Sequence, residues 1–120
     1  MKNLLISGIL LLMTASLTYA QSYTNWDYKS IEEFYEKVSV KSGTLGEDGK
    51  KISCVFTPTE IKLGTYEVRI IDYKNDLYEI KGTNYYVKFR SYVGYWGYSG
   101  KEGILEVGSS AWSSKFYIKP

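Results

Sequence analysis

Residues 91–101 combine four large aromatic side chains with three glycines, and they are the part of the chain best suited to contact a ligand. The aromatic residues are Tyr92, Tyr95, Trp96 and Tyr98. Glycine lets the backbone turn sharply, while tyrosine and tryptophan are amphipathic plates with little side-chain entropy to lose. Such a loop can stack on sugar rings or fill a pocket of a protein partner.

The alternative role for these rings is structural: they can cap the open end of a sheet and complete the core. A small domain has few large side chains, and most of them are buried. Consecutive residues of an extended backbone face opposite sides. We therefore expect at least one of Tyr95 and Trp96 to be exposed.

Four residues with oxygen-bearing side chains gather around one predicted turn, and they are the chain's other candidate for chemistry. They are Asp72, Asn75, Asp76 and Glu79. Their spacing does not match the calcium loop, and Asp and Asn are the usual turn residues, so we predict a turn and no metal site. Glycosidases use two carboxylates, and Asp72, Asp76 and Glu79 could supply them. A carboxylate-only hydrolase is therefore an alternative function, although so short a chain has little room for a cleft.

The chain contains no histidine and one cysteine, which excludes most enzyme mechanisms. Without an imidazole there is no Ser/His or Cys/His dyad and no ordinary catalytic zinc site. Cys54 alternates with Ile52 and Phe56, so we expect it to be a small buried side chain and not a nucleophile. We predict no cofactor and do not expect an enzyme.

The first twenty residues are typical of a cleaved signal peptide. Lys2 precedes the apolar run of residues 4–13, and Thr18 and Ala20 are small residues that suit a signal peptidase. An apolar run of about ten residues is half of what a membrane-spanning helix needs, so we expect no stable membrane insertion after cleavage. The sequence predicts export to the periplasm or the extracellular space, with residues 21–120 forming one domain.

Charge and cysteine content limit the partners of that domain. Lys2 is the one charged residue of the predicted signal peptide, so its removal lowers the net charge from +2 to +1. So balanced a charge argues against nucleic acid. A lone cysteine cannot form an internal disulfide, and exported domains of this size without disulfides are more typical of bacteria.

One helix is predicted, beginning near Ser30 and about ten residues long. Ser30 and Glu33 have the spacing of a capping box. Apolar residues then recur at i, i+3, i+4 and i+7, which is typical of one face of an amphipathic helix. Those residues are Ile31, Phe34, Tyr35 and Val38.

The rest of the chain predicts strands, because apolar and polar residues alternate with a period of two. A loop over residues 41–50 precedes them, and turns are expected at residues 73–76 and 82–84. The six predicted strands cover about residues 52–57, 66–71, 77–81, 85–90, 104–107 and 112–118. Short links between them favour antiparallel pairing.

The predicted fold is therefore α+β and mostly β: one N-terminal amphipathic helix packed on an antiparallel meander of about six strands. A sheet of six strands can also curl into a small barrel, which would protect its edges. Three functions stay open. The first is an exported binding module that contacts a protein or a glycan through Tyr92, Tyr95, Trp96 and Tyr98. The second is an envelope assembly protein that associates through sheet edges, and the third is the carboxylate-only hydrolase.

Overall fold

Seven antiparallel strands form most of the regular structure of residues 23–120, the part of the chain that the computed structural model describes. The strands are β1 (Tyr28–Ser39), β2 (Cys54–Thr59), β3 (Gly64–Asp72), β4 (Tyr78–Ile80), β5 (Tyr85–Phe89), β6 (Lys101–Val107) and β7 (Lys115–Ile118). Two short 3-10 turns, η2 (Tyr23–Asn25) and η3 (Ala111–Ser113), complete the set. The predicted signal peptide, residues 1–20, lies outside the described residues.

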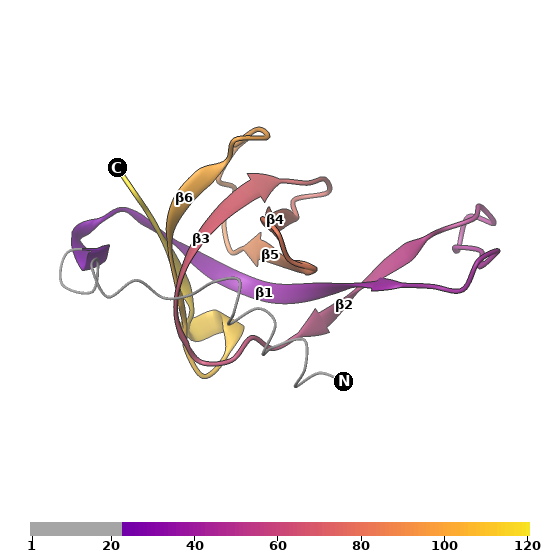
Figure 1. Cartoon of the computed structure of the whole chain (residues 1–120), viewed down its shortest axis with the longest axis horizontal. Helices are drawn as coiled ribbons and strands as arrows, with labels where there is room; N and C mark the ends of the chain where they lie inside the picture. Colours follow the sequence, from indigo (N-terminus) through magenta and orange to yellow (C-terminus); the bar gives the residue numbers. More distant parts are fainter. Residues whose placement is uncertain (1–22) are drawn as a thin grey trace.

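Six of the strands close into a barrel (Figure 1). Their order is β1, β5, β4, β3, β6 and β7, and β7 pairs back onto β1. The antiparallel pairing predicted from the short links is thus confirmed, and this last pairing closes the barrel. The predicted meander is wrong in part, because β5 and β6 follow one another in the chain but are separated in the sheet by β4 and β3. Closure leaves no unpaired edge along most of the sheet, which protects a small β protein from edge-to-edge association.

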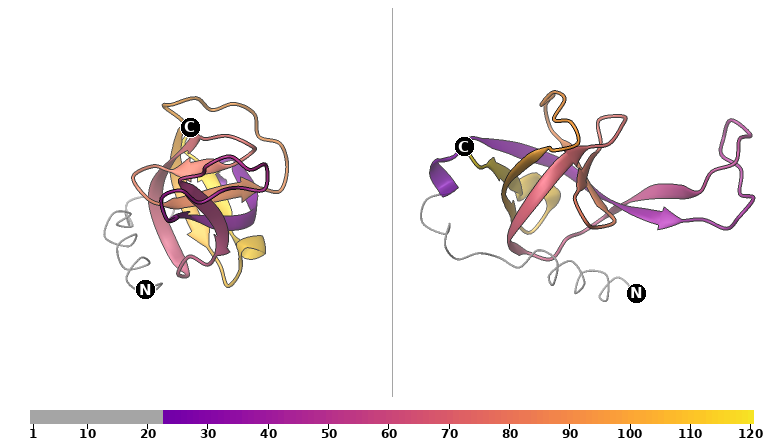
Figure 2. Two further views of the ribbon diagram at one scale, coloured as in Figure 1. Left: turned by 90° about the vertical axis from the view of Figure 1, so that its right-hand side faces the viewer. Right: turned by 45° about the horizontal axis from the view of Figure 1, so that its top comes forward.

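Strand β1 is long enough to belong to both the barrel and a projecting arm. Its first residues pair with β7, with Tyr28 opposite Tyr117, while residues 34–39 pair with β2. On its other edge β1 pairs with β5. The far end of β1 and the extra strand β2 therefore extend beyond the barrel as a two-stranded arm (Figures 1 and 2).

The predicted helix from Ser30 is wrong: these residues are strand β1, and residues 23–120 contain no α-helix. The pairing register between β1 and β5 shifts between Ile31 and Glu33, which marks a β-bulge. A bulge inserts one extra residue, so Ile31 and Phe34 both point into the core although they are three residues apart. That spacing imitates a helical period. The predicted capping box is absent because residues 30–33 belong to a strand and there is no helix start to cap; the Glu33 carboxylate accepts a hydrogen bond from the amide of Phe34.

The barrel interior is filled by apolar side chains from all six strands. Fully buried members include Ile31 and Phe34 of β1, Ile70 of β3, Val87 of β5 and Phe116 of β7. Tyrosines supply much of the remaining core, because their rings pack inside while their hydroxyls reach polar partners. Those in the main core cluster are Tyr66, Tyr78 and Tyr85.

Two strand predictions need correction at their ends. Trp112 belongs to η3, not to the last strand, and its ring is 63% exposed. Cys54 is half-buried instead of buried, because β2 lies on the arm and not in the barrel wall. The alternating pattern thus placed the start of the last strand too early, and for Cys54 it identified a strand without showing whether that strand lies over the core.

Arg90 fastens the end of β5 to neighbouring segments. Its Nε donates to the carbonyl of Ile31 at 3.1 Å, and its guanidinium also donates to the carbonyl of Trp112. The guanidinium carbon lies 3.9 Å from the centre of the Trp112 ring, a cation–π contact. Arg90 therefore fixes the point at which the chain leaves β5 and enters the aromatic segment.

Candidate functional site

The aromatic segment predicted from the sequence is the loop of residues 90–100, which we call the tyrosine loop. It joins β5 to β6, and these strands are not neighbours: β4 and β3 lie between them in the barrel. The loop must therefore pass across the end of the barrel, and it leaves the barrel in a different direction from the β1–β2 arm (Figure 2). Its conformation follows from the contacts it makes on that path.

The carboxylate of Asp72, at the end of β3, holds the centre of the loop. Its Oδ2 accepts a hydrogen bond from the backbone amide of Trp96 and another from Gly97, the latter at 2.6 Å. The Asp72 amide in turn donates to the carbonyl of Gly97 at 3.3 Å. Arg69, also on β3, donates to the carbonyl of Ser99 at 2.6 Å. The returning half of the loop is thus bound to the edge of one strand.

The Trp96 side chain holds the first half of the loop. Its ring packs against Tyr78, Phe89 and Phe116, with ring centres 5.1, 5.4 and 6.0 Å away. Its indole Nε1 donates to the carbonyl of Val93 at 3.1 Å, and the Tyr78 hydroxyl donates to the carbonyl of Gly94 at 2.5 Å. Trp96 therefore extends the main core, and the loop around it has a defined shape.

The three tyrosines of the loop point away from this anchored backbone. Tyr92 is 85% exposed, Tyr95 is 78% exposed and Tyr98 is 91% exposed, whereas the tyrosines of the main core cluster are 5% exposed or less. Of the four candidate residues, the structure exposes these three and packs Trp96 against the core. Tyr95 and Trp96 face opposite ways, as their adjacency in the sequence predicts.

Burial beneath the loop raises the pKa of Tyr78 to about 12, and the negative charges of Asp72 and Asp76 add to the effect. Burial first, and then the charge of Glu36, raises the pKa of Tyr85 to about 12 as well. The ordinary value for both groups is 10.0. Each hydroxyl therefore keeps its proton in the folded protein over a range in which the unfolded chain has lost it.

These shifts predict a loss of stability at alkaline pH. Well below pH 10 both hydroxyls are protonated in the folded and in the unfolded state, so their ionisation does not affect stability. Between about pH 10 and 12 the unfolded state alone loses these protons, and the free energy of unfolding falls by up to roughly 1.4 kcal/mol per pH unit for each group. Urea unfolding measured at intervals from pH 9 to 12 should show this slope. Tyr78→Phe should reduce the slope, Tyr85→Phe should do the same, and a Tyr78→Phe slope equal to that of the wild type would contradict the assignment.

The acidic residues that suggested a metal or hydrolase site do not form one cluster. The Asp72 carboxylate accepts hydrogen bonds from the two loop amides. Glu79 lies opposite Ile71 in the β3–β4 ladder, so its side chain is on the same face of the sheet as Ile71 and on the other face from Asp72. Asn75 and Asp76 form the tight turn between the strands, both with positive φ. Within residues 23–120, no three acidic or cysteine side chains come close enough to hold a metal ion.

The sequence pattern indicates the tyrosine loop but not the residues that shape it. Asp72 and Tyr78 bind loop atoms 16 to 25 positions away in the chain, and no local pattern signals such contacts. A weak signal existed in the position of Asp72, because a carboxylate at the last residue of a buried strand requires a hydrogen-bond donor.

Comparisons with known proteins add no relative from which a function could be transferred. No family model matches the chain, and no curated protein or solved structure matches it. No helix within residues 23–120 has the length and apolar character needed to span a membrane. The function of this protein is therefore inferred from the geometry of the tyrosine loop.

Proposed function

We propose that this protein is an exported binding module, and that Tyr92, Tyr95 and Tyr98 form the surface with which it contacts a protein or a glycan. The observation that carries the proposal is the contrast within one loop. The backbone is fixed by Asp72, Tyr78 and Trp96, whereas the three tyrosine rings that it presents are at least 78% exposed.

Rigid presentation of exposed rings favours binding for an energetic reason. Ordering side chains and loops during association reduces affinity, and a loop that is already ordered avoids part of that cost. Tyrosine supplies a large contact area with few rotatable bonds, which is why it is enriched in binding surfaces. The exposed rings have little to contribute to folding, since hydrophobic stabilisation requires burial.

Replacing the three tyrosines by alanine should remove binding and leave the fold intact. Labelled wild type should bind at least one member of a glycan array or a peptide array, and the Tyr92→Ala, Tyr95→Ala, Tyr98→Ala triple variant should bind that member at least tenfold more weakly. The melting temperature should change by less than about 5 °C, because substitutions of exposed side chains have small effects on stability.

The control replaces three large hydrophobic side chains that are exposed outside the tyrosine loop. Tyr28, Leu45 and Leu63 are 48%, 59% and 67% exposed, so their triple alanine variant removes apolar surface away from the loop. Its affinity should stay within threefold of the wild type. A loop variant that binds everything the wild type binds, or a control variant that loses binding equally, would refute the proposal.

A second candidate function, association through a sheet edge, is favoured by the free edge of β2. In the described part of the chain β2 pairs with β1 alone. The Val40 amide donates to the carbonyl of Ser53, so these two opposed residues form a hydrogen-bonded pair. Along an antiparallel ladder such pairs alternate with non-hydrogen-bonded pairs. Cys54, Phe56 and Pro58 belong to the non-hydrogen-bonded pairs, so their backbone groups point toward the free edge.

Pro58 weakens this edge, because proline has no amide hydrogen to donate. Proline on an edge strand is a common protection against unwanted strand pairing. We therefore place assembly second, and concentration-dependent sedimentation of the wild type is the measurement that supports it.

A further inference from the structure

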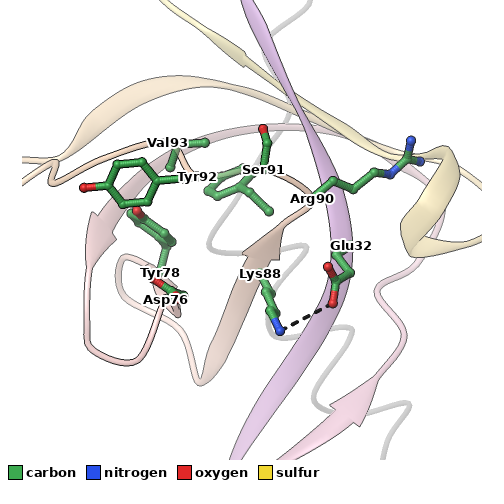
Figure 3. Close-up of a pocket in the computed structure, with 9 residues that line it drawn as sticks. Glu32, Asp76, Tyr78, Lys88, Arg90, Ser91, Tyr92 and Val93 are labelled. Atoms are coloured by element: carbon green, nitrogen blue, oxygen red, sulfur yellow. Dashed lines mark ion pairs between the residues drawn. The ribbon is translucent and has the colours of Figure 1, made fainter.

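Two shallow hollows adjoin the tyrosine loop, and Tyr92 contributes to the walls of both. One, of about 190 Å³, is lined by residues of β1 and β5 and by the start of the loop, including Glu32, Lys88 and Ser91 (Figure 3). The other, of about 280 Å³, is lined by the β3–β4 turn and by Tyr95. Three residues line both hollows: Asp76, Tyr78 and Tyr92. The hollows are therefore neighbours that share Tyr92 as a common wall.

We infer that these two hollows bind an extended neutral oligosaccharide, with successive sugar units on the two sides of Tyr92. This inference rests on the proposed function and narrows its ligand to one class. The size of the hollows favours an extended ligand. Each is smaller than the roughly 300–1,000 Å³ of pockets that enclose a compact small molecule. A ligand that extends through both uses the site more fully than a compact one in either.

The charges around the hollows disfavour an anionic ligand. Lys88 Nζ lies 3.4 Å from Glu32 Oε2, so these two charges compensate each other. The guanidinium of Arg90 points away from this pair toward η3, where it stacks on Trp112 (Figure 3). The negative Asp76 lines both hollows, and the second hollow also contains the positive Lys74 and the negative Asp72, whose carboxylate is hydrogen-bonded to the loop amides. Because these walls carry no excess of positive charge, an anionic ligand gains no net attraction from them, and an uncharged ligand needs none.

The surface chemistry matches a sugar ring. A pyranose presents C–H groups on its face and hydroxyls at its rim. Tyrosine offers a ring face for the former and a hydroxyl for the latter. Asn75, Asp76 and Ser91 add hydrogen-bonding groups to the walls of the hollows. This mixture of aromatic and short polar side chains suits a ligand with many hydroxyls.

Strand addition, a common mode of peptide binding, is not available at this face. It requires an open sheet edge. β4 pairs with β3 on one side and with β5 on the other, and the hollows border a turn and a loop. A proline-rich peptide, which docks on aromatic grooves without strand pairing, is the remaining peptide class and becomes an outcome of the test.

Calorimetric titration of the exported form, purified after expression of the full chain, tests this inference. The probes are gluco-, manno- and chito-oligosaccharides of one to four units, together with a proline-rich peptide. At least one sugar series should bind, with affinity rising at least tenfold from one unit to three. Tyr92→Ala should lower the affinity for the three-unit sugar at least tenfold and remove the dependence on length, whereas Leu45→Ala, on the arm, should change it less than threefold.

The outcomes separate this inference from the proposed function. If the proline-rich peptide binds in a Tyr92-dependent manner and no sugar does, the oligosaccharide assignment is wrong and the binding module stands. Sugar binding that does not depend on length also refutes the two-hollow arrangement. If no sugar series binds at millimolar concentration, the inference is overturned. If the triple tyrosine variant keeps the binding of every ligand that the wild type recognises, the proposed function fails as well.

Discussion

Trp96→Ala should lower the free energy of unfolding by about 3 kcal/mol, because removing a large aromatic side chain from a core costs about 3–5 kcal/mol and Trp96 is only partly buried. The substitution removes the ring contacts with Tyr78, Phe89 and Phe116 and the hydrogen bond to the carbonyl of Val93. Equilibrium urea unfolding measures the change. Binding should weaken too, since the loop loses its internal anchor.

The neighbouring tyrosine supplies the control. Tyr95→Ala, one position earlier, should change the free energy of unfolding by no more than about 0.5 kcal/mol, because the Tyr95 ring is 78% exposed. Trp96→Phe should lie between the two, since it keeps part of the ring packing and loses the indole donor. Equal stability of Trp96→Ala and Tyr95→Ala would show that Trp96 does not anchor the loop.

Gly100→Ala should destabilise the protein by about 2–4 kcal/mol through two separate effects. Gly100 has φ of +63°, a left-handed conformation that is costly for alanine. A Cβ atom at this position would also lie 2.1 Å from the carbonyl oxygen of Ile70, so the loop could not rejoin β6 beside β3 without a backbone shift. Thermal or urea unfolding measures the loss.

Gly94→Ala separates the two effects of the Gly100 substitution. Gly94 also has positive φ, at +90°, but a Cβ atom there would meet nothing within 4 Å. This variant should therefore lose only the conformational part, about 1 kcal/mol. If Gly94→Ala and Gly100→Ala are equally destabilised, the close approach of Gly100 to β3 is not important for stability.

The strands that cover the core were predictable from sequence where alternation was uninterrupted. Tyr66, Val68 and Ile70 face the core as the pattern of β3 indicates, and Tyr85, Val87 and Phe89 do so in β5. The signal failed in β1, because the bulge between Ile31 and Glu33 changed the spacing of inward residues from two to three. A period of three over so short a segment cannot be distinguished from a helix by pattern alone.

The barrel and the site depend on contacts between distant residues. Closure requires the first residues of β1 to pair with β7 near the other end of the chain, which local periodicity does not report. In the same way, composition identified residues 91–101 as unusual but could not separate Trp96 from the three tyrosines. That distinction depends on contacts with distant residues: the Trp96 ring packs against Tyr78, Phe89 and Phe116, and the Asp72 carboxylate accepts hydrogen bonds from the amides of Trp96 and Gly97.

The central claim is that Tyr92, Tyr95 and Tyr98 are presented for binding and are not needed for folding. The most direct test is the free energy of unfolding of the triple alanine variant, measured in urea beside the wild type and Trp96→Ala. We predict a value within about 1 kcal/mol of the wild type, because all three rings are largely exposed. A loss of about 3 kcal/mol, equal to that of Trp96→Ala, would show that the rings belong to the core and would contradict the account.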